Sequence, residues 1–148
     1  MTFNVVASGG PVNILKGLDL SIRAGEAVGI VGPSGSGKTS LLMLLAGLER
    51  ASSGMLCVAG QDLGALDEDA LARLRRDRIG IVFQAFHLVP TMTARENVAV
   101  PLEFAGRRDA FERAEAALRE VGLGHRLDHY PGQLSGGQAQ RVAIGRAL

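Results

Sequence analysis

The stretch VGIVGPSGSGKTSLL, residues 28–42, decides the fold of this 148-residue chain. It begins within an uninterrupted apolar run, Ala27–Val31, of the kind that parallel sheets bury on both faces. A glycine-rich loop that matches G-x-x-x-x-G-K-[ST] comes next, and the Leu-rich residues after it predict a buried helix over Thr39–Leu48. A strand before the motif and a helix after it are the context that this motif requires. The stretch therefore predicts an α/β fold with a phosphate-binding loop.

The residue types of this loop suit a polyphosphate. Its glycines allow main-chain N–H groups to point inward, and the following helix adds its positive N-terminal end. We expect Lys38 to reach the β and γ phosphates and Thr39 to offer its hydroxyl to Mg²⁺. Lys38 is one of two lysines beside fourteen arginines, so a general excess of lysine does not explain it. The expected binding residues are Gly32, Pro33, Ser34, Gly35, Ser36, Gly37, Lys38, Thr39 and Ser40.

Hydrophobic periodicity predicts the elements around this loop. Strands are expected at residues 3–7, 14–22, 27–31, 55–58 and 79–83, the first two forming an antiparallel hairpin through a turn at 8–11. Helices are expected at 67–76, from 91 or 93 to 98 with an interruption at Pro101, at 109–122 and at 136–148. Asp67 is expected to cap its helix, and Asp109 with Glu112 fits a capping box.

Composition narrows the classes of function. The formal net charge of +1 argues against nucleic acid as the main partner, because proteins that bind the phosphate backbone carry a basic excess. Cys57 is the single cysteine and is expected to be buried. One cysteine cannot form an internal disulfide, which favours a reducing compartment. The longest aliphatic block, Leu41–Leu48, is far shorter than the roughly 20 residues that cross a bilayer. Any membrane contact is therefore expected to go through a partner.

A second glycine cluster opens the final predicted helix and consists of Leu134, Ser135, Gly136, Gly137 and Gln138. LSGGQ after such a phosphate loop resembles the ATP-binding cassette (ABC) family, the nucleotide-binding subunits of ABC transporters. IGIVFQ, which ends in Gln84, resembles the Q-loop of that family. The segments HLVPTMTARENVAVPL and GLGHRLDHYPGQLSGGQ are similar to the branch with lipoprotein-release and macrolide-export ATPases. The resemblance covers essentially the whole chain.

The resemblance implies a P-loop NTPase fold of the α/β class. This fold has an N-terminal antiparallel piece, a partly parallel core sheet and a helical subdomain that carries the LSGGQ signature. In this chain the sheet is expected to be incomplete. Residues 1–148 then form a partial ATP-binding domain, with the nucleotide-binding core at 1–83, the Q-loop and helical subdomain at 84–134, and the signature and its helix at 134–148. The implied cofactors are ATP and Mg²⁺, and the metal contacts are Thr39 and Gln84.

The resemblance also implies partners. Ser135, Gly136 and Gly137 serve a nucleotide held by a second ABC subunit, so that two ATP molecules join a head-to-tail dimer. A helix N-terminus suits the γ-phosphate, because its exposed N–H groups bind the anion and no side chain blocks the approach. Gln84 lies between Mg²⁺ and a transmembrane permease subunit. The implied location is cytoplasmic, on the inner face of the plasma membrane, with no nucleic-acid partner.

The family's hydrolytic residues are implied to follow the signature helix: an aspartate for Mg²⁺, an adjacent glutamate that activates water, and a histidine. The sequence ends at Leu148, and its histidines all precede that helix. We identify no catalytic residue here and expect a piece of a longer chain that binds nucleotide far better than it hydrolyses it. Because the aspartate strand belongs beside Ala27–Val31, we also expect an unpaired apolar edge there.

The predicted function is the ATP-binding, energy-coupling subunit of an ABC transporter. One alternative is a soluble ABC-type ATPase of the DNA-repair or chromosome type, and another is a nucleotide-binding remnant without turnover. Several of the soluble proteins have long insertions between the two glycine motifs, whereas only about fifty residues separate Gln84 from Ser135. This spacing favours transport. The cargo and the direction of transport are not predicted.

Overall fold

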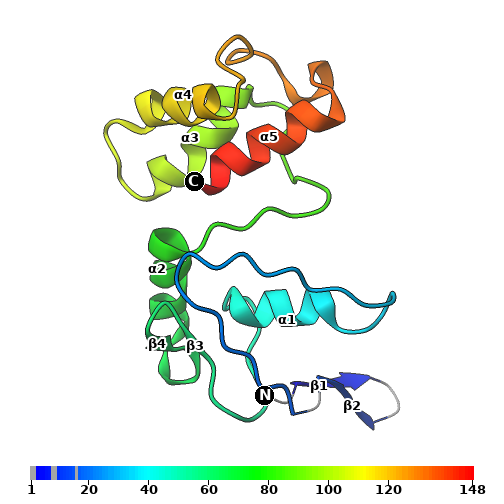
Figure 1. Ribbon diagram of the computed structural model, residues 1–148. Helices are drawn as coiled ribbons and strands as arrows, with labels where there is room; N and C mark the ends of the chain where they lie inside the picture. Colours follow the sequence, from blue (N-terminus) through cyan, green and yellow to red (C-terminus); the bar gives the residue numbers. More distant parts are fainter. Residues whose placement is uncertain (1–2, 8–9, 16) are drawn as a thin grey trace. The chain divides into compact units, whose positions relative to one another are not determined.

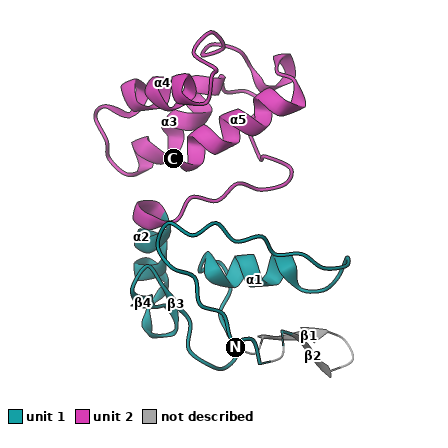
Figure 2. Ribbon diagram, in the orientation of Figure 1, with its two compact units in different colours: residues 1–75 teal, residues 76–148 magenta. Residues whose placement is uncertain are grey.

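The computed structural model describes the backbone of residues 3–7, 10–15 and 17–148, together with the side chains of Leu15 and of residues 17–148. The chain divides into two compact units, residues 1–75 and residues 76–148. Figure 1 labels the elements and Figure 2 colours the units.

Unit 1 opens with an antiparallel hairpin of β1 (Phe3–Ala7) and β2 (Gly10–Leu15). The first predicted strand is confirmed. The second was predicted at 14–22 and is wrong in its bounds, since residues 18–22 form no strand and Leu20 and Ile22 are nearly half exposed. Alternating apolar residues make a strand only where a neighbouring strand bonds the backbone and a core covers one face. Of the turn predicted at 8–11, residues 8 and 9 lie outside the described residues.

The strands predicted at 27–31 and 79–83 do not form in the described structure. Val31 is 93% exposed and Val28 is 46% exposed, so this apolar run is not covered on two faces. A parallel strand needs neighbours that bond its N–H and C=O groups, and the described residues supply none beside these segments.

The sheets formed by the described residues are two-stranded and antiparallel: β1 with β2, and β3 (Cys57–Val58) with β4 (Gln61–Asp62). The partly parallel core sheet expected from the sequence is therefore not seen in this part of the chain. The strand predicted at 55–58 is confirmed for its last two residues only. Cys57 is exposed, not buried as predicted, and its neighbour Leu56 is the buried residue.

The phosphate loop leads into α1 (Lys38–Leu45), which confirms the predicted helix there. The helix ends three residues before the predicted end at Leu48, because Gly47 adopts φ +64 and turns the chain away from the helix. Leu41 and Leu44 are the buried residues of α1, and they pack the helix against the rest of unit 1.

The predicted helix after Asp67 is confirmed as α2 (Glu68–Arg78). The Asp67 carboxylate accepts the N–H of Ala70 at 2.8 Å, as expected for a cap. The Arg75 guanidinium donates to the carbonyl oxygen of Gly47 at 2.6 Å. Arg75 thus ties α2 to the turn that ends α1. The one-turn 3₁₀ helix η1 (Leu63–Ala65) precedes α2.

Unit 2 is built from α3 (Ala94–Phe104), α4 (Ala110–Glu120) and α5 (Gly136–Ala147), which pack pairwise against one another (Figure 1). A short 3₁₀ helix, η2 (Pro131–Gln133), lies before α5. The shared core consists of Ala94, Val98, Ala99, Ala110, Ala114, Leu118, Leu123 and Val142. Throughout the described ranges, the helices are too short or too polar to cross a bilayer.

The starts of α3 and α4 follow the sequence signals, with two corrections. Thr93, one of the two predicted starts, caps α3 through a capping box with Glu96. Pro101 lies inside α3 and does not interrupt it; the missing N–H removes one helical bond, and packing of α3 on two helices compensates. Asp109 precedes α4 but forms no capping box, because its carboxylate accepts from Arg113 Nε at 2.6 Å instead.

Candidate functional site

The phosphate loop of unit 1 is shaped by its glycines. Gly35 and Gly37 adopt φ +78 and φ +86, a left-handed conformation that residues with a Cβ rarely take. A Cβ on Gly32 would lie 2.8 Å from the Ser36 hydroxyl oxygen. The Ser36 N–H donates to the Pro33 carbonyl oxygen at 3.3 Å and closes the loop. The sequence therefore folds into a tight, solvent-exposed loop at the start of α1.

The N-terminus of α1 presents main-chain donors. Gly37 is the N-cap and has no side chain to cap the helix. The first bonded amide is that of Leu41, which donates to the Gly37 carbonyl oxygen at 2.9 Å. Within the described residues, the amides of Lys38, Thr39 and Ser40 have no hydrogen-bond acceptor. Free amides at the positive end of a helix dipole form an anion-binding site.

Lys38 places its ammonium group over the same loop. Its Nζ donates to the carbonyl oxygens of Gly32 at 2.8 Å and Pro33 at 2.6 Å, and lies 3.3 Å from the Ser36 hydroxyl oxygen. In the part of the chain that the structure describes, Lys38 pairs with no carboxylate. Its positive charge is thus held by neutral dipoles, which an incoming anion can replace.

The signature segment of unit 2 begins α5. Ser135 is the N-cap, and its hydroxyl oxygen accepts the Gln138 N–H at 3.3 Å. The Gln138 side chain in turn accepts the Ser135 N–H at 2.9 Å, which completes a capping box. Gly136 and Gly137 are exposed, and a Cβ on either would meet no described atom within 4 Å. The first turn of α5 therefore offers bare backbone to the solvent.

Leu134 anchors this turn. Its side chain is partly buried and packs against the hydrophobic core of unit 2. The segment before it is bonded to the N-terminus of α3, since the amides of Ala94 and Arg95 donate to the carbonyl oxygens of His129 at 2.8 Å and Leu127 at 3.0 Å. The start of α5 is thus held by α3 as well as by its own cap.

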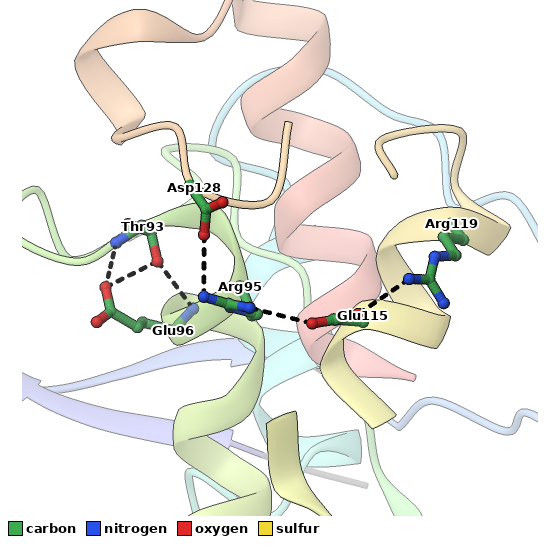
Figure 3. A network of polar contacts seen from close by, with 6 residues as sticks. All are labelled: Thr93, Arg95, Glu96, Glu115, Arg119 and Asp128. Carbon is green, nitrogen blue, oxygen red and sulfur yellow. Dashed lines mark hydrogen bonds and ion pairs between the residues drawn. The ribbon is translucent and has the colours of Figure 1, made fainter. Parts of the chain in front are cut away.

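A polar network strengthens that attachment, and Figure 3 shows it. The Arg95 guanidinium bonds Asp128 at 2.9 Å and Glu115 of α4 at 3.0 Å. Glu115 also accepts from Arg119 at 2.9 Å. Because Asp128 lies in the segment that leads to the signature, the network joins that segment to α3 and α4.

Gln84 is exposed in a turn of unit 2 that is closed by the Phe86 N–H and the Phe83 carbonyl oxygen at 3.0 Å. Phe86 and His87 after it adopt φ +60 and φ +46, an uncommon conformation for residues other than glycine. The phosphate loop belongs to unit 1, whereas Gln84 and the signature belong to unit 2. The structure brings Gln84 and the signature into one compact unit.

Comparison with known proteins identifies the family, because residues 15–148 match the family described as ABC transporter. The chain belongs to the ABC transporter family. It is 55% identical over 139 residues to the macrolide export ATP-binding/permease protein MacB of Marinobacter nauticus, and 52% identical to MacB of Escherichia coli strain K12. Each alignment covers 93% of this chain, and the chain spans 22% of the length of these relatives.

Solved structures agree with this assignment. The chain matches the dimeric ATP-binding cassette MJ0796 in a post-hydrolysis state bound to ADP and Pi, with a TM-score of 0.89 and 41% identity. A second dimeric structure of MJ0796, described as a bacterial ABC transporter cassette, matches equally well. The match covers 99% of this chain and 66% of that chain. The P-loop NTPase fold of the ABC cassette, expected from the resemblance, is thereby confirmed.

Sequence reasoning missed two residues that hold the segments next to the candidate site, namely Arg95 and Asn97. Arg95 and Asn97 both lie in α3, and neither carries a motif of its own. Asn97 is only 1% exposed and bonds the backbone of residues 89–93, which follow the Gln84 turn. A polar residue within the apolar face of a predicted helix is the one signal that marks Asn97 in advance.

Proposed function

We propose that this chain is the ATP-binding, energy-coupling part of an ABC transporter. It binds MgATP, pairs head-to-tail with a second cassette and drives a membrane permease. The observation that carries the proposal is the uncapped start of α1, where three free amides and the Lys38 ammonium converge on one exposed loop. Among the residues that the structure describes, Lys38 pairs with no carboxylate, and such a cluster of donors suits a triphosphate.

Within this proposal, the residues 32–40 bind the phosphates of ATP. The backbone amides at the start of α1 take the β and γ phosphates, and Lys38 exchanges its bonds to Gly32 and Pro33 for phosphate oxygens. The exchange is favourable because a charged acceptor binds an ammonium group more strongly than a carbonyl oxygen does.

The residues proposed for Mg²⁺ fit that ion in donor chemistry. Thr39 offers an exposed hydroxyl at the first turn of α1, and Gln84 offers an exposed amide oxygen. Mg²⁺ prefers hard oxygen ligands and keeps several waters, so few protein ligands are needed. When bound, the ion neutralises charge on the β and γ phosphates.

The proposed partner of the signature is the nucleotide of a second cassette. Gly136 and Gly137 leave the N-terminal amides of α5 open to an approaching phosphate, while the capping box holds Ser135 and Gln138 in place. The dimeric form of the similar cassette MJ0796, bound to ADP and Pi, supports such a pairing. For the permease partner, the support is the name of the MacB relatives, which are ATP-binding/permease proteins.

ATP hydrolysis coupled to transport is proposed from family membership, with no residue of this chain assigned as the base. The proposed location is the cytoplasmic face of the plasma membrane, where a permease holds the chain. The MacB similarity favours this function over a soluble ABC-type ATPase.

The test is titration of a fluorescent ATP analogue with Mg²⁺ onto the chain and its Lys38→Ala variant. Because a hydrogen bond to a charged group contributes about 1.5–3 kcal/mol, we expect a loss of affinity of about 12- to 150-fold. The control is Arg73→Ala, which removes an exposed cation of α2 in the same unit and should leave the affinity unchanged. Equal affinity of K38A and the parent chain would refute the proposed site.

A further inference from the structure

The last turn of α5 contacts the chain on both sides of Gln84. The Arg146 guanidinium donates to the carbonyl oxygens of Phe86 at 2.6 Å and His87 at 2.7 Å. On the other side, Gly80 lies so close to Ala147 that a Cβ on it would clash with the Ala147 carbonyl oxygen. The turn that carries Gln84 is therefore bracketed by the C-terminal end of α5.

The Arg146 contact is bidentate and carries a charge. Arg146 is partly buried, and this burial lowers the pKa of its guanidinium. Among the described residues it has no carboxylate partner, so two carbonyl oxygens are the groups that compensate its charge. Both carbonyls belong to residues with positive φ, a backbone conformation that persists only where the surroundings hold it. Arg146 is the side chain that bonds both of these residues.

The opposite end of α5 carries the signature. Val142, Ala143 and Gly145 are buried along the helix, which fixes it within unit 2. At a rise of about 1.5 Å per residue, Gly136 and Arg146 lie about 15 Å apart along one continuous helix. A helix of this length that packs on two others moves as a rigid element. A displacement of its signature end therefore also displaces the Phe86 and His87 carbonyl groups that bond Arg146.

We propose that Arg146 is a positioning residue that fixes the Gln84 turn to the signature helix, so that the two move as one body. The functional meaning rests on the proposed function, in which Gln84 faces Mg²⁺ and the permease while the signature faces the partner's ATP. Arg146 then acts through the Phe86 and His87 backbone and contacts no nucleotide. The mechanical link itself needs no ligand, so it is measurable separately.

The experiment measures the distance between the two ends by pulsed electron paramagnetic resonance. Nitroxide labels are placed at Ala85, beside Gln84, and at Gln140, in the first half of α5, both exposed. Cys57, the single native cysteine, is changed to Ser beforehand. In the parent chain we expect one narrow distance distribution, because both labels sit on one body.

In Arg146→Ala we expect the width of the distance distribution to increase about twofold. The turn that carries Gln84 is then no longer bonded to α5 and moves independently of it. Arg146→Lys keeps the charge but not the two-pronged geometry, so its width should fall between those of R146A and the parent chain. Arg141→Ala is the matched control: Arg141 lies on the same helix, is exposed and makes one long contact of 3.5 Å, so the distribution should stay narrow.

A distribution in R146A as narrow as in the parent chain would overturn the proposal. If tyrosine fluorescence shows that R146A is unfolded, Arg146→Met takes its place with the same two outcomes, because methionine keeps an aliphatic stem and has no donor. MgATP titration of the parent chain is run in parallel. Absence of nucleotide binding would sink the proposed function while leaving the link between α5 and the Gln84 turn standing.

Discussion

Replacing Asn97 by alanine should loosen the whole segment that follows Gln84. Asn97 is 1% exposed, and its side-chain oxygen accepts the Val89 N–H at 2.7 Å. Its side-chain nitrogen donates to the carbonyl oxygens of Val89 at 3.1 Å, Met92 at 3.0 Å and Thr93 at 3.0 Å. One amide side chain thus closes a five-residue loop onto α3.

The magnitude follows from which groups lose their partners. The Val89 carbonyl oxygen keeps the Met92 N–H, and the Thr93 carbonyl oxygen keeps the Asn97 N–H, because both bonds are main-chain. The Val89 N–H and the Met92 carbonyl oxygen lose the bonds described here. At about 1–1.5 kcal/mol for each partly buried group, Asn97→Ala should lower the free energy of unfolding by about 2–3 kcal/mol.

The assay is urea unfolding followed by the fluorescence of Tyr130, the single tyrosine of the chain. Tyr130 lies between α4 and α5, so it reports on unit 2. With an m-value of about 1.5 kcal/mol/M, the midpoint should fall by about 1.3–2 M. Glu103→Ala changes an exposed residue of the same helix and should shift the midpoint by less than about 0.3 M. An N97A midpoint as high as that of E103A would refute the reasoning.

Two further predictions concern unit 2. Leu118 is fully buried, so Leu118→Ala should cost about 2–5 kcal/mol in the same Tyr130 assay, and a loss below about 1 kcal/mol would contradict the core described for α4. Hydrogen bonds from the Thr93 N–H and hydroxyl hold the pKa of Glu96 below its ordinary 4.5. This group therefore adds stability that is present above pH 4.5 and is lost as the pH falls through the lowered pKa. In Glu96→Gln the urea midpoint should therefore fall less as the pH is lowered. A pH profile identical to that of the parent chain would contradict this prediction.

The helices and the site motifs were predictable because their signals are local. The Gly37–Lys38–Thr39 sequence specifies a left-handed turn followed by a helix start, and Ser135 with Gln138 specifies a capping box; each acts over three or four residues. For the same reason Asp67 was predicted as a cap, and Thr93 was one of the two predicted starts of its helix. The Asp109 capping box was wrong because Arg113, one turn away, competes for the same carboxylate.

Strands and long-range contacts could not be predicted in this way, because they depend on segments that lie far apart in the sequence. Apolar runs such as 27–31 carry the composition of a strand, yet a strand exists only where another segment bonds its backbone, and that segment is not specified by the run itself. Likewise, nothing near Arg146 in sequence indicates Phe86 and His87, about sixty residues earlier, as its acceptors. The sequence by itself determined the glycine-rich turn before α1, the cap of α5 and the helix starts, since neighbours along the chain supply those bonds. Only the tertiary structure decided which carbonyl oxygens accept hydrogen bonds from Arg146 and Asn97, because folding alone brings distant backbone groups within hydrogen-bonding distance of these two side chains.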